Sequence, residues 1–133
     1  MTHWADAYVG RPARGPRPCW DLVRQVWIDR LGFVMPSFDE TDDPEEAVGL
    51  GASRFAHVAT GLERELDAVM MLVPLQTRSQ GRLGFRNAET HIGVVAAPGL
   101  VLHVEKGRTA VVEDIRALKV SRILRGPWAG GAA

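Results

Sequence analysis

The sequence predicts an α+β fold in which N-terminal helices pack on a roughly five-stranded antiparallel sheet. Apolar residues recur at three- and four-residue spacing over residues 19–31, which is the pattern of an amphipathic helix. From residue 68 onward, short apolar runs alternate with turn residues, which is typical of strands. Because the helical and strand patterns occupy separate parts of the chain, we expect helices gathered on one side of an antiparallel sheet.

The composition indicates one domain. The chain has 133 residues, of which 46% are hydrophobic, and 16 basic residues balance 16 acidic ones. We therefore expect a single domain over residues 1–133 with a loose tail at residues 126–133. The charge balance disfavours nucleic acid and anionic membranes as partners. We expect no membrane insertion and no signal peptide, and therefore synthesis in the cytoplasm, because no apolar segment is long enough for a span or a leader.

Two helices are expected before the sheet. The first covers about Cys19–Leu31 and follows a loop rich in proline and glycine, and Gly32 supplies its C-terminal stop. The acidic residues 36–46 predict a solvated loop. Within them, a proline followed by two glutamates suits a helix N-terminus, so we expect the second helix to run from Pro44 to about Thr60.

Five short apolar runs predict the strands. They are bounded by charged residues, by Pro74 or by turn sequences such as Ala97-Pro98-Gly99. Their spacing predicts an antiparallel meander. The runs are Ala68–Val73, Ile92–Ala96, Leu100–Glu105, Thr109–Asp114 and Val120–Leu124.

Cys19 is the single cysteine of the chain and lies at the expected start of the first helix. One cysteine excludes an intramolecular disulfide and a four-cysteine zinc site. The positive end of a helix dipole lowers the pKa of a nearby thiol and favours the nucleophilic thiolate. The alternative is a buried, unreactive cysteine. A basic partner for the thiol would decide between the two.

His91 and His103 lie in neighbouring apolar runs, where an unpaired imidazole is costly to bury. If residues 97–99 form a bulged three-residue loop, His103 faces Gly93 and the two histidines point to the same face, about 7–8 Å apart. A plain two-residue turn would put them on opposite faces. The bulged loop therefore allows one histidine to orient the other.

Cys19, His91 and His103 together match the needs of a cysteine hydrolase. They would supply a nucleophile, a general base and a residue that orients the base. This chemistry needs no metal and no cofactor. The same side chains could ligate zinc, but their spacing follows no compact zinc motif. We therefore predict catalytic residues that act without a metal.

Five segments of the chain resemble, in order, the NlpC-type papain-like cell-wall cysteine peptidases. The resemblance runs from Tyr8 to about Arg125 and is closest to the branch of tailed phages and phage-like gene transfer agents, where a Cys-Trp pair followed by Leu-Val-Arg is typical. The segments are Tyr8-Val9-Gly10-Arg11-Pro12, Cys19-Trp20-Asp21-Leu22-Val23-Arg24, Asp67-Ala68-Val69-Met70-Met71, His91-Ile92-Gly93-Val94-Val95 and Leu102-His103-Val104.

The resemblance implies a papain-like NlpC-type fold and assigns roles to the site residues. It makes Cys19 the nucleophile, His91 the base and His103 the third polar residue. Tyr8 matches a tyrosine near the nucleophile, with a packed aromatic as the alternative, and together with Trp20 it is our candidate for substrate binding or the oxyanion region. By the same analogy, the backbone N–H of the nucleophile contributes to the oxyanion hole.

Three positions depart from the family pattern, and one further match is structural. Pro18 and Trp20 replace the Asp and Ser that many cell-wall members carry beside the nucleophile and that are associated with gripping the free amine of the stem peptide. Asp21 replaces a glycine common in phage members, and its carboxylate would oppose thiolate formation if it points toward the sulfur. Asp67 matches an acid at the start of a family strand, which we interpret as structural.

The resemblance implies a cysteine-type peptidase or amidase that hydrolyses amide bonds in peptidoglycan stem peptides. A phage tail or gene transfer agent would carry it to the target-cell envelope and open the wall during DNA delivery. The implied partners are the peptidoglycan peptide and other tail or baseplate proteins. The alternative is a structural tail-tip or assembly protein with little or no activity, although an intact Cys19, His91 and His103 argue against it.

Overall fold

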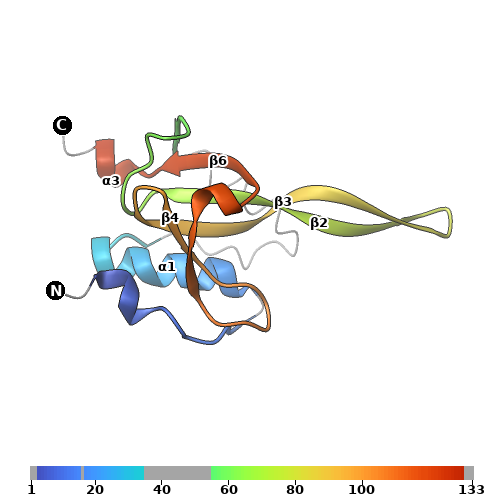
Figure 1. Cartoon of the computed structure of the whole chain (residues 1–133), viewed down its shortest axis with the longest axis horizontal. Coiled ribbons are helices and arrows are strands. Elements are labelled where there is room, and N and C mark those ends of the chain that lie inside the picture. Colours follow the sequence, from blue (N-terminus) through green and yellow to red (C-terminus); the bar gives the residue numbers. More distant parts are fainter. Residues whose placement is uncertain (1–2, 16, 35–54, 131–133) are drawn as a thin grey trace.

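A six-stranded antiparallel sheet dominates the computed structural model, which describes residues 3–15, 17–34 and 55–130 (Figure 1). The strand order is β1-β6-β2-β3-β4-β5. The strands are β1 (Ala56–Val58), β2 (Ala68–Ser79), β3 (Arg82–Ala97), β4 (Leu100–His103), β5 (Val111–Asp114) and β6 (Val120–Arg125).

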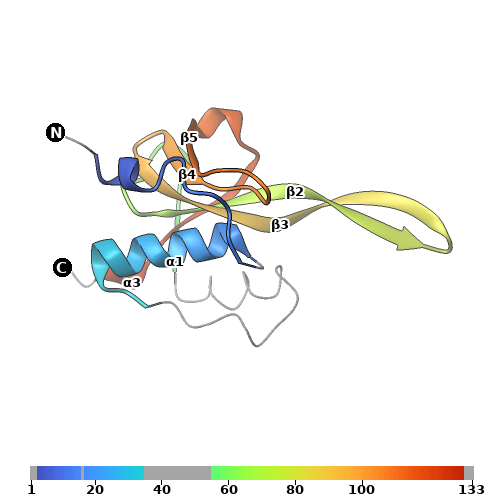
Figure 2. The ribbon, with the colours of Figure 1, turned by 90° about the horizontal axis from the view of Figure 1, so that it is seen from below.

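One long helix, α1 (Pro18–Leu31), covers one face of the sheet (Figure 2). Pro18 suits the first helical turn, where a missing backbone N–H costs nothing. Gly32 ends the helix in the left-handed conformation with a φ of 62°, and its N–H donates to the carbonyl of Ile28. The predicted helix over residues 19–31 is confirmed.

The helix packs through apolar side chains on its inner face. Val23, Val26 and Trp27 are fully buried and belong to one core with Met70 and other apolar residues of the sheet. Burying side chains of this size removes apolar area from water and is the main term that holds the helix to the sheet. The opposite face of the sheet has a smaller core made by Val69, Met71, Val95 and Val101.

Three short helical turns complete the described elements. They are a 3₁₀ turn η1 (Trp4–Ala7), a 3₁₀ turn η2 (Ile115–Ala117) and α3 (Pro127–Gly130). Trp128 of α3 lies against Trp27, Phe33 and Phe55, with ring centroids 5.0–5.6 Å from its own. Such tilted and edge-to-face aromatic contacts add to the area they bury, so α3 closes the end of the helix-side core.

The predicted fold class is wrong. The prediction was N-terminal helices on a five-stranded sheet, as in a papain-like NlpC-type fold. The sheet instead has six strands, and α1 is the one long helix among the described residues. The second expected helix, from Pro44 to Thr60, ends in a region that forms β1 instead. Residues 56–58 pair with β6 through the register Ala56↔Arg125 to Val58↔Ile123. Long-range pairing of this kind overrides a weak local helix preference. Residues 55, 59 and 60 are not helical either, and residues 44–54 of that expected helix lie outside the described residues.

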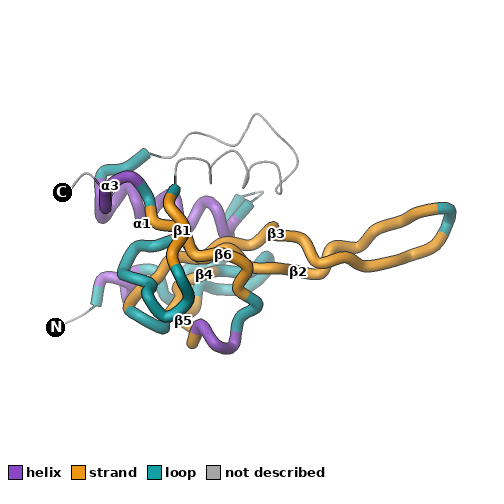
Figure 3. Tube along the Cα trace, turned by 90° about the horizontal axis from the view of Figure 1, so that it is seen from above, coloured by secondary structure: helices purple, strands orange, loops and turns teal. Residues whose placement is uncertain are grey.

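A long two-stranded hairpin made by β2 and β3 projects from the body of the molecule (Figures 1 and 3). Gln80 and Gly81 form its turn with φ values of 51° and 75°, the conformation of a type I′ turn. The predicted strands stopped at Pro74, but the hairpin continues to Ser79. Because β6 pairs only with Ala68–Met71 of β2, Pro74 lies in a part of β2 with one open edge, where a proline is tolerated.

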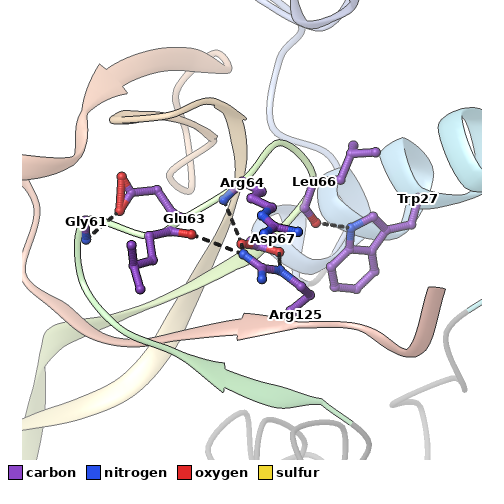
Figure 4. Close-up of polar contacts among 8 residues, drawn as sticks. Trp27, Gly61, Glu63, Arg64, Leu66, Asp67 and Arg125 are labelled. Atoms are coloured by element: carbon purple, nitrogen blue, oxygen red, sulfur yellow. Dashed lines mark hydrogen bonds and ion pairs between the residues drawn. The ribbon is translucent and has the colours of Figure 1, made fainter. Parts of the chain in front are cut away.

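A buried ion pair fixes the loop that enters β2 (Figure 4). Asp67 is 1% exposed and accepts hydrogen bonds from Nε and Nη2 of Arg125 at 3.0 and 2.8 Å, and from the backbone N–H of Arg64 at 2.8 Å. Next to it, the indole N–H of Trp27 donates to the carbonyl of Leu66 at 3.0 Å. The polar groups of this loop therefore tie β6 and α1 to the start of β2.

In the described ranges, no helix has both the length and the apolar character needed to span a membrane.

Candidate functional site

The turn between β3 and β4 sets which face the two histidines share. Pro98 and Gly99 form a two-residue turn, and Gly99 has a φ of 83°. A bulge follows in the register, which changes from Val95↔Val101 to Ala97↔Leu100. The inserted residue restores the parity that a plain two-residue turn would reverse. The prediction of a shared face is therefore confirmed, through a two-residue turn with a bulge in β3 rather than a three-residue loop.

Gly93 provides the space in which His103 sits. The register Val94↔Leu102 puts Gly93 opposite His103. A Cβ atom on Gly93 would lie 3.1 Å from the Cβ of His103 and 2.6 Å from Cγ1 of Val101. The approach to Val101 is closer than real Cβ atoms come and the approach to His103 is tight, so a larger residue here would force the facing residues of β4 to shift.

His91, His103 and Glu113 form a chain of polar contacts across β3, β4 and β5. Nε2 of His91 lies 2.9 Å from Nδ1 of His103, and Nε2 of His103 lies 3.1 Å from Oε1 of Glu113. His103 is 1% exposed, whereas the side chain of Glu113 is 42% exposed. Both ring nitrogens of the buried His103 therefore have partners, which offsets the cost of burying the ring.

Glu113 was not predicted from the sequence as a site residue. It lies in the predicted strand Thr109–Asp114, two residues after Val111, which pairs directly with His103. Side chains two residues apart on a strand point to the same face, so strand parity was the signal that could have found it.

Burial keeps His91 neutral at physiological pH. It lowers the pKa of the imidazole from its usual 6.5 to about 4, with a smaller contribution from the neighbouring His103. A neutral imidazole has one nitrogen that can accept a proton. His91 is therefore unprotonated at neutral pH, with one ring nitrogen that can accept a hydrogen bond or a proton.

Lowering the pH from 7 to 5 is expected to reduce the free energy of unfolding by roughly 2 kcal/mol through His91 alone. The unfolded chain binds a proton at His91 near pH 6.5, whereas the folded protein does so only at about pH 4. Between these values the unfolded state binds more protons, so acid favours unfolding. Urea titrations of the wild type and His91→Gln at both pH values measure the effect. An equal loss of stability in the two proteins would contradict it.

Cys19 is the second residue of α1, and its thiol is buried. Burial raises the pKa of the thiol, backbone groups of Ile92, Trp20 and Cys19 itself lower it by less, and the Asp21 carboxylate raises it further. The expectation of a lowered pKa is therefore wrong, because desolvation outweighs the helix N-terminus. At rest the thiol is protonated, and it needs a base to become nucleophilic.

Cys19 lies beside β3, against the backbone of Ile92. The contribution of the Ile92 backbone to its pKa places the thiol against the residue that directly follows His91. Within the described parts of the chain, the ring of His91 contacts the ring of His103, and Cys19 makes no hydrogen bond to His91. The structure thus joins His91 to His103 directly and places the Cys19 thiol against the backbone of the next residue, Ile92.

Tyr8 and Trp20, the two candidates for the substrate or oxyanion region, are both buried. The Tyr8 hydroxyl donates to the carboxylate of Asp29, and burial followed by this carboxylate raises the pKa of Tyr8 to about 12. Asp29 lies ten residues after Cys19, about 15 Å along the helix. The Tyr8 hydroxyl therefore fastens the N-terminal segment to α1 away from the thiol. Trp20 packs in the helix-side core.

A cavity of about 370 Å³ borders the far end of the histidine chain. It is lined by His103, Glu105, Arg108, Thr109, Val111 and Glu113. Solvent in this cavity has access to Glu113, whose side chain is partly exposed. In the ranges that the structure describes, no group of three or more His, Cys, Asp or Glu side chains is arranged to hold a metal ion.

Comparison with known proteins adds no assignment, since no protein-family model and no curated protein matches the chain.

Proposed function

We propose that the protein is a cysteine peptidase that hydrolyses amide bonds in the peptide stems of peptidoglycan. The observation that supports this best is the buried contact between Nε2 of His91 and Nδ1 of His103, together with the Cys19 thiol that lies against the backbone of the next residue, Ile92. A neutral histidine held by a second histidine, close to the single thiol of the chain, provides the groups that nucleophilic acyl transfer needs.

The reaction follows from these groups. His91 takes the proton of the Cys19 thiol through Nδ1, the ring nitrogen that does not contact His103. The thiolate attacks the carbonyl carbon of the amide, and the backbone N–H groups at the start of α1 stabilise the negative oxygen. His91 then gives its proton to the leaving amine, which departs and leaves a thioester. A water molecule activated by His91 hydrolyses the thioester, so that the acid and the free thiol are released.

The substrate class rests on the resemblance to cell-wall peptidases in the segments around Tyr8, Cys19, Asp67, His91 and His103. The same resemblance supports delivery by a phage tail or a gene transfer agent, with the target-cell envelope as the place of action. Tail or baseplate proteins would then be its partners. Because the formal net charge is zero, attraction to the wall would come from contacts at the site or from the carrier particle rather than from bulk charge.

Digestion of purified sacculi tests this function. We expect the wild type to release soluble muropeptides and Cys19→Ala to release none above the level of buffer. Mass spectrometry of the products identifies the bond, because each cleavage creates one new amine and one new carboxyl group. Far-UV circular dichroism of both proteins checks that the substitution leaves the fold intact. Equal release by the two folded proteins would rule out the thiol as the nucleophile.

A second candidate is a structural tail-tip or assembly protein that works by binding neighbours. Two observations favour it. The thiol of Cys19 is buried with a raised pKa, and the projecting hairpin exposes Leu83 and Phe85 by 59% and 74%, as interaction sites often do. The sacculus assay separates the candidates, because a purely structural protein releases no muropeptides with Cys19 present or absent.

A further inference from the structure

The chain from Glu113 to His91 fixes where the protons of both histidines lie. An ionised carboxylate only accepts hydrogen bonds, so the Nε2 of His103 that faces Glu113 must carry a proton. In a neutral ring the other nitrogen is then unprotonated, so Nδ1 of His103 accepts. Its partner at 2.9 Å, Nε2 of His91, must therefore donate. This leaves Nδ1 of His91 with a free lone pair.

We propose that Glu113 is a positioning residue that selects, through His103, the tautomer of His91 in which Nδ1 can accept a proton from Cys19. The inference rests on the proposed peptidase function for its catalytic meaning, but the tautomer itself is a property of the resting protein. The reversed arrangement, with Nδ1 of His103 donating to Nε2 of His91, would place a proton on Nδ1 of His91 and block its action as a base.

Three features of the surroundings support this role. His103 is 1% exposed, so its ring is held in place by packing. Glu113 reaches it from the neighbouring strand, on the same face of the sheet, because Val111 pairs with His103 and Glu113 is two residues further along β5. Glu105, a second carboxylate on the same cavity, pairs instead with Arg108 at 3.5 Å.

The test uses Glu113→Leu, which removes the acceptor at a partly exposed position, with Glu105→Gln as the matched control. Nitrogen-15 NMR of labelled histidine distinguishes protonated from unprotonated ring nitrogens without any substrate. For the wild type and Glu105→Gln, we expect His91 to be protonated at Nε2 and unprotonated at Nδ1. For Glu113→Leu we expect a mixture of both tautomers, and Glu113→Gln, whose amide oxygen still accepts, should restore part of the original population.

Muropeptide release by the same variants gives the catalytic readout. We expect Glu113→Leu to lose activity by about 10- to 100-fold, the usual effect of removing a group that orients a catalytic side chain, while Glu105→Gln keeps the wild-type rate. A His91 tautomer that is the same in wild type and Glu113→Leu would overturn the inference. If the tautomer changes in Glu113→Leu but neither the wild type nor any variant releases muropeptides, the positioning role is upheld and the peptidase function is refuted.

Discussion

Replacing His91 with alanine is expected to lower the rate of muropeptide release by roughly 10²–10⁴-fold, the usual contribution of a general base. The reason is that burial keeps the Cys19 thiol protonated, so that hydrolysis requires a group to remove its proton. His91 is the neutral base next to the residue that contacts the thiol. The measurement is the initial rate of muropeptide release from sacculi at neutral pH.

His57→Ala is the control for this experiment. His57 is an exposed histidine on β1, and its removal should leave the rate unchanged. Urea unfolding of both variants shows whether any loss of rate comes from loss of structure. If His91→Ala kept the wild-type rate while folded, the base would have to be another group, and the assignment of His91 would fail.

The largest effect on stability is expected for Asp67→Ala, which should lower the free energy of unfolding by about 3–5 kcal/mol. The substitution leaves the Arg125 guanidinium, whose side chain is 21% exposed, without its carboxylate partner. It also removes the acceptor for the backbone N–H of Arg64. Urea titration followed by tryptophan fluorescence measures the loss, because the indole of Trp27 is bonded to the same loop.

Two controls separate the buried pair from surface charge effects. The pair between Glu105 and Arg108 is largely exposed, so Glu105→Ala should change the free energy of unfolding far less than Asp67→Ala does. A double-mutant cycle of Asp67→Ala and Arg125→Ala measures the coupling between the two side chains. Additive effects in this cycle would mean that the ion pair does not hold the loop, contrary to our interpretation.

Much of the framework followed from local sequence patterns. Helix α1 was predicted from its apolar spacing and from Gly32, and the apolar runs around residues 68–73 and 92–96 belong to the observed strands β2 and β3. The outer part of the hairpin was missed, because residues 74–90 contain mostly polar residues and a proline and pair mainly with each other. Strand β1 was missed because its pairing partner, β6, lies more than 60 residues away in the chain.

The contact between the two histidines of the candidate site was predictable, because strand parity decides which side chains share a face of the sheet. His91 and His103 meet because a bulge in β3 puts them on one face, which the sequence allowed as one of two alternatives. The state of the Cys19 thiol was not predictable. Its position at a helix start suggested a lowered pKa, but the depth of burial depends on how α1 packs against the sheet, and burial raises the pKa instead.

The most direct test of the account is the alkylation rate of Cys19 by iodoacetamide in the folded protein. Because Cys19 is the single cysteine of the chain, the mass increase of the intact protein reports on this thiol alone. We expect the wild type at neutral pH to react at least about tenfold faster than His91→Ala, since the thiolate is the reacting species and His91 assists its formation. After unfolding in urea, the two proteins should react equally fast. Equal rates in the folded state, or a folded wild-type thiol that does not react at all, would contradict the claim that Cys19 is a nucleophile activated by His91.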